Sequence, residues 1–284
     1  MKMSKTVRIW VDALWYAVAF LLIQLVVTAV VSLCMGVFGG VSSAETSAGT
    51  AEVSSLYANP KMLILAQFFI FLITVGVFVW RKWAPFSNDY IRTRPWAALF
   101  WIAIMTTGTI IPSIYLNELL DYEVPSEVEK MLTNVINEPL GYLVVGILIP
   151  VAEEIVFRGA VLRALLRLFD GHRHWIAIIV SALIFGVVHG NLSQGVHAFI
   201  IGLLLGWMYY RTNSIVPGIV LHWINNTLAY IMVRLLPQSS DMKLVELFGG
   251  DEKRVWMALV FSLLIFLPSL YQLTIRLKRP EERR

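Results

Sequence analysis

Long apolar stretches without charge are the feature that most limits how this chain can fold. No acidic or basic residue occurs between Ala13 and Phe38, and this stretch follows Lys2, Lys5 and Arg8. At a rise of about 1.5 Å per residue, such a helix is long enough to cross a bilayer. Hydrophobic residues make up 58% of the sequence and charged residues 15%, which is too apolar for a soluble domain of this length. The sequence therefore predicts an integral membrane protein.

Eight apolar stretches can be marked along the chain. They cover residues 13–38, 61–80, 96–120, 139–162, 174–190, 194–211, 215–236 and 255–277. Backbone polar groups in lipid must be satisfied within their own segment, so these continuous runs predict helices rather than barrel strands. Residues 121–138 are acidic with apolar positions at helical spacing, which indicates a short interfacial helix. We expect an all-α polytopic protein with eight transmembrane helices, folded as one domain over residues 1–284.

The basic residues are divided unevenly between the two sets of loops. Most of the 23 Lys and Arg residues flank one alternating set, whereas the acidic segment 121–138 belongs to the other. This asymmetry predicts that both termini are cytoplasmic and that the number of spans is even. It also accounts for the net charge of +4 without a nucleic-acid partner. We expect a multi-pass protein of the cell membrane, in contact with the lipid bilayer.

An ionisable cluster lies in the fourth apolar stretch, at Glu153, Glu154 and Arg158. A charged side chain at bilayer depth costs at least about 2.5–3.5 kcal/mol on insertion scales, so such a cluster indicates a functional site. Glu154 and Arg158 are four residues apart, which places them on one helical face as an ion pair. Glu153 points about 100° away. We expect Glu153 to be the unpaired carboxylate that serves as a base, although a buried packing triad would also explain the cluster.

Two later stretches add histidines. Phe185 precedes His189 by one helical turn, and His222 precedes Asn226 by one turn. An imidazole and an amide on one face offer N–H groups that can stabilise an oxyanion. Each pair also has a structural interpretation, as a helix-end histidine or as a hydrogen-bonded clamp between helices.

Together these segments resemble the CAAX-processing and bacteriocin-processing (CPBP, or Abi) family of intramembrane proteases. That family carries Glu-Glu-x-x-x-Arg, Phe-x-x-x-His and His-x-x-x-Asn or Asp on successive helices, in the order and spacing found here. The resemblance covers a core of about residues 139–232. The first three stretches and the last are expected to add only length and topology.

The resemblance implies an intramembrane endopeptidase with an eight-helix fold similar to CAAX prenyl protease 2, the eukaryotic enzyme that trims prenylated proteins. It implies that Glu153 and His189 activate water, that His222 and Asn226 hold the oxyanion, and that the site is supported by Glu154, Arg158 and Phe185. Prenylated CAAX tails, bacteriocin-type precursors and other membrane-associated proteins or peptides are all compatible substrates.

Other interpretations of the same residues remain open. Glu153, His189 and His222 could supply the three protein ligands of a catalytic zinc ion. We favour metal-free water activation, because no His-Glu-x-x-His helix is present and Arg158 and Asn226 suit an anion better than a cation. A proton- or ion-coupled transporter and a catalytically idle membrane scaffold are the alternative functions.

The predicted depths of the two histidines do not agree. Counted from the start of each span, His189 lies about 22 Å along the fifth stretch, whereas His222 lies about 10 Å along the seventh. For both to reach Glu153, the fifth helix must be short or sunk into the bilayer, with the turn at 190–194 covered by protein. Irregular backbone at that depth must line a cavity or be covered, so we expect a water-filled pocket there.

Overall fold

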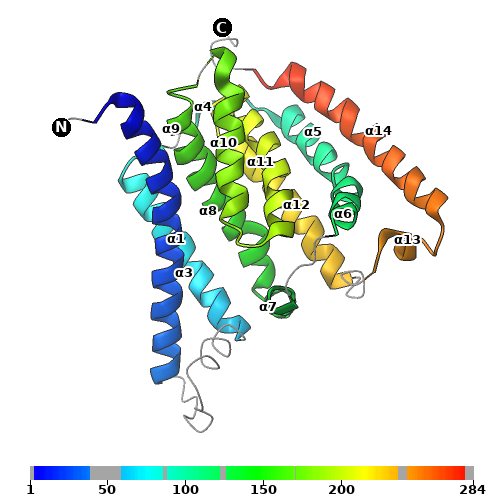
Figure 1. Cartoon of the computed structure of the whole chain (residues 1–284), viewed down its shortest axis with the longest axis horizontal. Coiled ribbons are helices and arrows are strands. Elements are labelled where there is room, and N and C mark those ends of the chain that lie inside the picture. The colour runs from blue at the N-terminus through cyan, green and yellow to red at the C-terminus, as the bar shows by residue number, and fades with distance from the viewer. Residues whose placement is uncertain are drawn as a thin grey trace.

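A computed structural model describes residues 3–38, 59–85, 88–121, 126–169, 171–235 and 242–278. Within these ranges the chain is all helical, without a strand (Figure 1). Most of the loop between the first two stretches, the residues 122–125 of the acidic segment and the basic tail 279–284 lie outside the described ranges. The all-α expectation is therefore confirmed.

The longer helices match the predicted stretches. They are α1 (Lys5–Phe38), α3 (Pro60–Trp80), α5 (Trp96–Thr107) with α6 (Ile110–Leu119), α11 (Leu192–Thr212), α12 (Val216–Leu235) and α14 (Glu252–Arg276). The shorter ones are α4 (Asp89–Arg92), α7 (Ser126–Asn137), the 3₁₀ turn η4 (Gly171–Arg173), α10 (His174–Val187) and α13 (Leu244–Leu247). The helix α7 forms where the acidic segment predicted a short helix.

Six helical segments of the described chain are long and apolar enough to cross a membrane, counting α5 and α6 together. The expected count of eight is thus not confirmed. Of the two remaining stretches, α10 has 14 residues, about 21 Å at the helical rise. The other runs unbroken from Leu143 to Leu165 but changes its winding, as π-helix η2 (Leu143–Leu148), α8 (Ile149–Glu154), π-helix η3 (Ile155–Leu162) and α9 (Arg163–Leu165).

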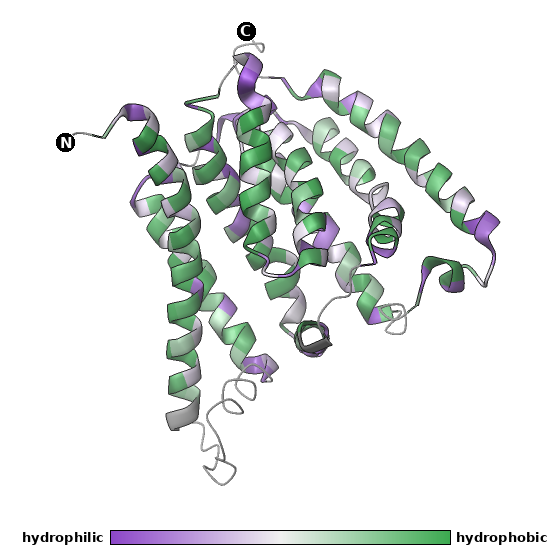
Figure 2. Cartoon of the chain, viewed as in Figure 1, coloured by the Kyte–Doolittle hydropathy of each residue, from purple (hydrophilic) through white to green (hydrophobic). Residues whose placement is uncertain are grey.

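The fourth segment is the centre of the molecule. Every residue of η3 is buried, and α1, α3, α10 and α11 all contact it. The helices α1 and α3 lie side by side at one edge, whereas α5 and α14 lie at the opposite edge (Figure 1). Apolar residues cover most of the long helices (Figure 2), as expected where lipid rather than water is the solvent. The ionisable cluster, at the end of α8 and the beginning of η3, is therefore enclosed by other helices.

The glycines Gly186 and Gly195 allow α10 and α11 to approach closely. A Cβ on Gly186 would lie 2.6 Å from the carbonyl oxygen of Gly195, and one on Gly195 would lie 3.0 Å from that of Gly186. Small residues at such crossings are typical of helix packing in membranes. The contact fixes the end of α10, from which the chain continues to His189.

The helix α10 is short, as one of the two alternatives for the depth of His189 required. In the turn at 190–194, Gly190 and Leu192 are exposed whereas Ser193 is buried, so protein covers this turn only in part. Before α12, Thr212 at the end of α11 and Ser214 in the connection are buried. The start of α12 therefore lies among other helices, and His222 on this helix is buried.

Candidate active site

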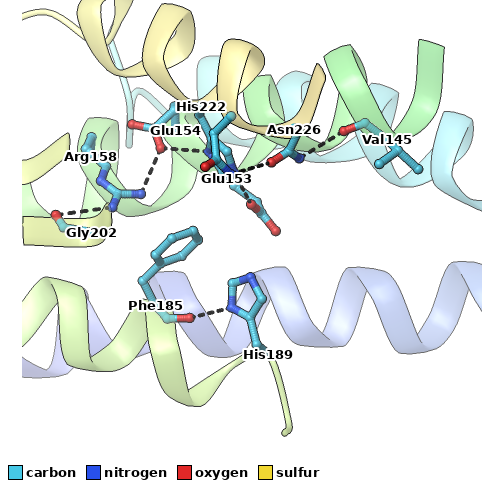
Figure 3. A network of polar contacts seen from close by, with 10 residues as sticks. Val145, Glu153, Glu154, Arg158, Phe185, His189, Gly202, His222 and Asn226 are labelled. Carbon is cyan, nitrogen blue, oxygen red and sulfur yellow. Dashed lines mark hydrogen bonds and ion pairs between the residues drawn. The ribbon is translucent and has the colours of Figure 1, made fainter. Parts of the chain in front are cut away.

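The predicted ion pair between Glu154 and Arg158 is present and fully enclosed. Arg158 Nη1 donates to Glu154 Oε1 at 2.8 Å, and the two side chains are 1% and 0% exposed. Arg158 Nη2 also donates to the carbonyl oxygen of Gly202 at 3.4 Å. The guanidinium lies 4.4 Å from the ring centre of Phe185, a cation–π distance. Phe185 and α11 therefore hold the arginine that neutralises Glu154 (Figure 3).

The His222 ring lies between the two glutamates. Its Nδ1 is 3.2 Å from Glu154 Oε1 and its Nε2 is 3.5 Å from Glu153 Oε2. The expectation that Glu153 has no partner is therefore wrong. Sequence spacing showed that Glu153 faces away from Arg158, but it could not show which residue of α12 would meet it.

A glycine on α12 makes room for this arrangement. The Cβ of any larger residue at Gly218 would collide with Glu154 Oε2, a buried oxygen that has no hydrogen-bond partner in the described part of the chain. Gly218 precedes His222 by one helical turn, so the glycine and the histidine face Glu154 together. The absence of a side chain at position 218 lets α12 approach α8 closely enough for His222 to reach both carboxylates.

Glu153 and His189 line one cavity of about 180 Å³. Its apolar wall is formed by Phe20, Ile70, Phe71, Leu148, Ile149, Ala152 and Val188, and its other polar residues are Gln24 and Gln67. Taking about 30 Å³ per water molecule, this space suffices for several waters. In Figure 3, the His189 ring points across a gap toward the side on which Glu153 and His222 lie. The expected pocket at the end of α10 is therefore present, although neither His222 nor Asn226 lines it.

A backbone bond determines the orientation of His189. Its Nδ1 lies 2.8 Å from the carbonyl oxygen of Phe185. A carbonyl oxygen can only accept, so in the neutral ring the proton sits on Nδ1 and Nε2 carries a free lone pair. The Phe185 ring also meets the imidazole edge to face, with centres 4.9 Å apart. Phe185 therefore fixes both the tautomer and the direction of an imidazole that can accept a proton.

The side-chain amide of Asn226 bonds to the backbone of the fourth segment. Its Nδ2 donates to the carbonyl oxygen of Val145 at 3.0 Å, and its Oδ1 accepts from Asn225 at 3.3 Å. Val145 belongs to η2, so the amide ties α12 to the π-helical part of the fourth segment (Figure 3). An amide nitrogen carries two N–H groups. One therefore remains after the bond to Val145.

The proposed zinc ligands are not arranged as a metal site. Among the residues that the structure describes, no three His, Cys, Asp or Glu side chains are grouped so that they could hold a metal ion. Both ring nitrogens of His222 face carboxylates, rather than a point shared with His189. The donor set of Glu153, His189 and His222 therefore does not fit a zinc ion in this structure.

Gln24 and Gln67 are site residues that the sequence interpretation missed. They lie on α1 and α3, stretches that were expected to contribute only length and topology, yet both line the cavity with Glu153 and His189. The available signal was an amide within an apolar span. Such polar residues usually face the interior of a membrane bundle.

The comparison with protein families agrees with this site. A model of the family "Type II CAAX prenyl endopeptidase Rce1-like" matches residues 135–228. This range contains Glu153, Glu154, Arg158, Phe185, His189, His222 and Asn226. All seven residues proposed from the sequence therefore fall inside the matching segment.

Three individual proteins are similar to parts of this chain. The putative membrane peptidase YdiL of Bacillus subtilis is 34% identical over 118 residues, 39% of this chain and 46% of that protein. The membrane-embedded CAAX protease MroQ of Staphylococcus aureus is 28% identical over 149 residues, 51% of this chain and 60% of that protein. The UPF0177 protein YaiF of Lactococcus lactis is 22% identical over 183 residues, 61% of this chain and 79% of that protein.

The alignments with the first two relatives span about half the length of each. No solved structure matches the chain significantly. The matching segment and the named relatives agree with the motifs read from the sequence. On these grounds, residues 135–228 of this chain are similar to the Rce1-like family of type II CAAX prenyl endopeptidases.

Proposed function

We propose that this protein is an intramembrane endopeptidase that hydrolyses a peptide bond with water activated by Glu153 and His189. The observation that carries the proposal is the shared cavity, which receives a carboxylate from α8 and an imidazole from the end of α10. Both groups can accept a proton from water, and a base must lie within hydrogen-bond reach of the water that it activates. A cavity of this size has room for that water beside both bases.

We assign His222 and Asn226 to support of the transition state. The His222 ring lies with Nδ1 3.2 Å from Glu154 Oε1 and Nε2 3.5 Å from Glu153 Oε2, so an N–H of the ring can donate to a neighbouring carboxylate. The charge of Glu154 is balanced by that of Arg158. When substrate binds beside Glu153, Nε2–H of His222 and the second N–H of Asn226 are the donors that we assign to the oxyanion.

The proposed substrate is a membrane-associated peptide segment, and a prenylated CAAX-like tail is the first candidate because residues 135–228 match the family model. Seven of the eleven residues that line the cavity are apolar, which suits a segment delivered from lipid. We propose that both termini face the cytoplasm of a cell membrane, as the charge asymmetry predicts. By the same argument, we expect the start of α10 on that side.

The test uses the purified full-length protein in lipid vesicles and a panel of quenched-fluorescent peptides. The panel contains a farnesylated CAAX tail, its unprenylated form, a bacteriocin-type leader and an unrelated apolar segment. We expect cleavage of at least one peptide, and a loss of at least about 100-fold in kcat for Glu153→Gln, the lower range of general-base contributions. Glu252→Gln, at the start of α14, is the matched control. Equal rates for Glu153→Gln and the wild type would exclude this mechanism.

A further inference from the structure

Two glutamines stand apart among the polar residues of the first two spans. Gln24 lies in a part of α1 that has no charged residue from Ala13 to Phe38, and Gln67 lies in a part of α3 that has none after Lys61. Each is therefore a strongly polar group within a helix whose surroundings are lipid or protein. An amide without a hydrogen bond is costly in such surroundings, so each of the two side chains needs a hydrogen-bond partner.

Both side chains face the cavity that holds Glu153 and His189. Within the described part of the chain, neither amide forms a hydrogen bond with protein. A polar side chain inside a membrane bundle normally bonds to a neighbouring helix. Since neither glutamine has such a bond among the described residues, what enters the cavity can supply their partners, namely water in the free protein and substrate in the complex.

We propose that Gln24 and Gln67 bind the main chain of the peptide substrate beside the bond that is cut. This inference rests on the proposed function. An amide side chain carries a donor and an acceptor, and it therefore matches the N–H and C=O of one peptide unit whatever the side chains of the substrate are. The glutamines come from α1 and α3, and the two bases come from α8 and the end of α10. A peptide in this cavity is thus bound by one pair of helices and attacked from the other.

Two other roles for the glutamines make different predictions. If they held the catalytic water, their removal would lower kcat and leave KM unchanged. If they joined α1 to α3, their removal would lower the thermal stability and leave both kinetic constants unchanged. Main-chain binding raises KM with kcat and stability preserved, because it is made equally in the ground state and the transition state.

The test compares Gln24→Leu, Gln67→Leu and a matched control, Gln272→Leu, which makes the same change on α14 away from the cavity. The substrate is a quenched-fluorescent farnesylated CAAX peptide, used with full-length protein in vesicles. Each cavity variant should raise KM about 3- to 10-fold, the range of one net hydrogen bond. The control should match the wild type. Thermal unfolding of every variant shows whether it is folded.

A second substrate series identifies the bonded group. Ester analogues of the same peptide, each lacking one main-chain N–H near the cleaved bond, should lose affinity for the wild type. For at least one analogue, that loss should disappear in Gln24→Leu or Gln67→Leu, because the group and its partner are then both absent. Additive losses for every analogue would overturn the inference, as would unchanged KM in both variants.

The outcomes also separate this inference from the proposed function. Cleavage that depends on Glu153 but is indifferent to both glutamines retains the proposed function and refutes the main-chain contacts. If the wild type does not cut the peptide, or if Glu153→Gln cuts it at the wild-type rate, the proposed function fails and the inference fails with it.

Discussion

The enclosed ion pair gives the sharpest prediction of stability. In Arg158→Met, the carboxylate of Glu154 loses its 2.8 Å partner while it stays 0% exposed. Removing one member of a buried pair costs about 3–5 kcal/mol, because the other charge is left uncompensated. Domains of 150–250 residues lose roughly 2–4 °C of melting temperature per kcal/mol. A fall of roughly 6–20 °C is therefore expected for Arg158→Met.

The same chain offers a matched control at its surface. Arg254 is paired with Asp251 at 3.5 Å, but these side chains are 61% and 45% exposed. Exposed pairs contribute about 0–1 kcal/mol, so Arg254→Met should lower the melting temperature by less than about 4 °C. The arginine and its replacement are identical in the two variants. The difference between them therefore isolates the effect of burial.

The assay is thermal unfolding in detergent, followed by the fluorescence of the ten tryptophans. A third variant, Glu154→Gln with Arg158→Met, removes both charges and should recover part of the stability lost in Arg158→Met. If Arg158→Met melts within the range of Arg254→Met, the Glu154–Arg158 pair does not stabilise the site and the account of its role is wrong.

Three further predictions concern packing, metal and topology. Gly218→Ala should destabilise the fold by about 1–3 kcal/mol through overpacking, and it should slow cleavage by displacing Glu154. Gly76→Ala, at a position with open space around it, should do neither. If unfolding and cleavage assays gave the same result for both variants, the close fit at Gly218 would be contradicted. EDTA dialysis should leave the cleavage rate unchanged, and loss of activity that zinc restores would support the metal alternative. In a cysteine-free background, Ser4→Cys should react with an impermeant maleimide only from the cytoplasmic face and Lys243→Cys only from the opposite face; the reverse pattern would contradict the orientation.

Local spacing predicted the parts of the site that lie on one helix. The Glu154–Arg158 pair and the contact of Phe185 with His189 follow from residues one turn apart, a relation fixed by helical geometry. The all-helical fold followed equally directly, because lipid leaves few other choices for a backbone. These features need no knowledge of how the helices pack.

Contacts between helices could not be predicted from the sequence. That His222 reaches both Glu153 and Glu154 depends on the close approach of α12 and α8 at Gly218, a crossing that no spacing encodes. The cavity wall from α1 and α3 was missed for the same reason, although Gln24 and Gln67 were visible as amides within apolar runs. The count of spans went unconfirmed because apolar length alone does not reveal a short α10 or a change to π-helical winding at η2 and η3.

Non-additivity between Glu153 and His189 is the most direct test of whether both activate one water molecule. Cleavage rates are measured at saturating enzyme for Glu153→Gln, His189→Ala and the double variant. If both groups act on the same water, the double variant should be no more than a few-fold slower than the slower single variant, because residues that act as a unit are strongly non-additive. Losses that multiply in the double variant would show that the two residues serve separate steps, and would contradict water activation by the pair.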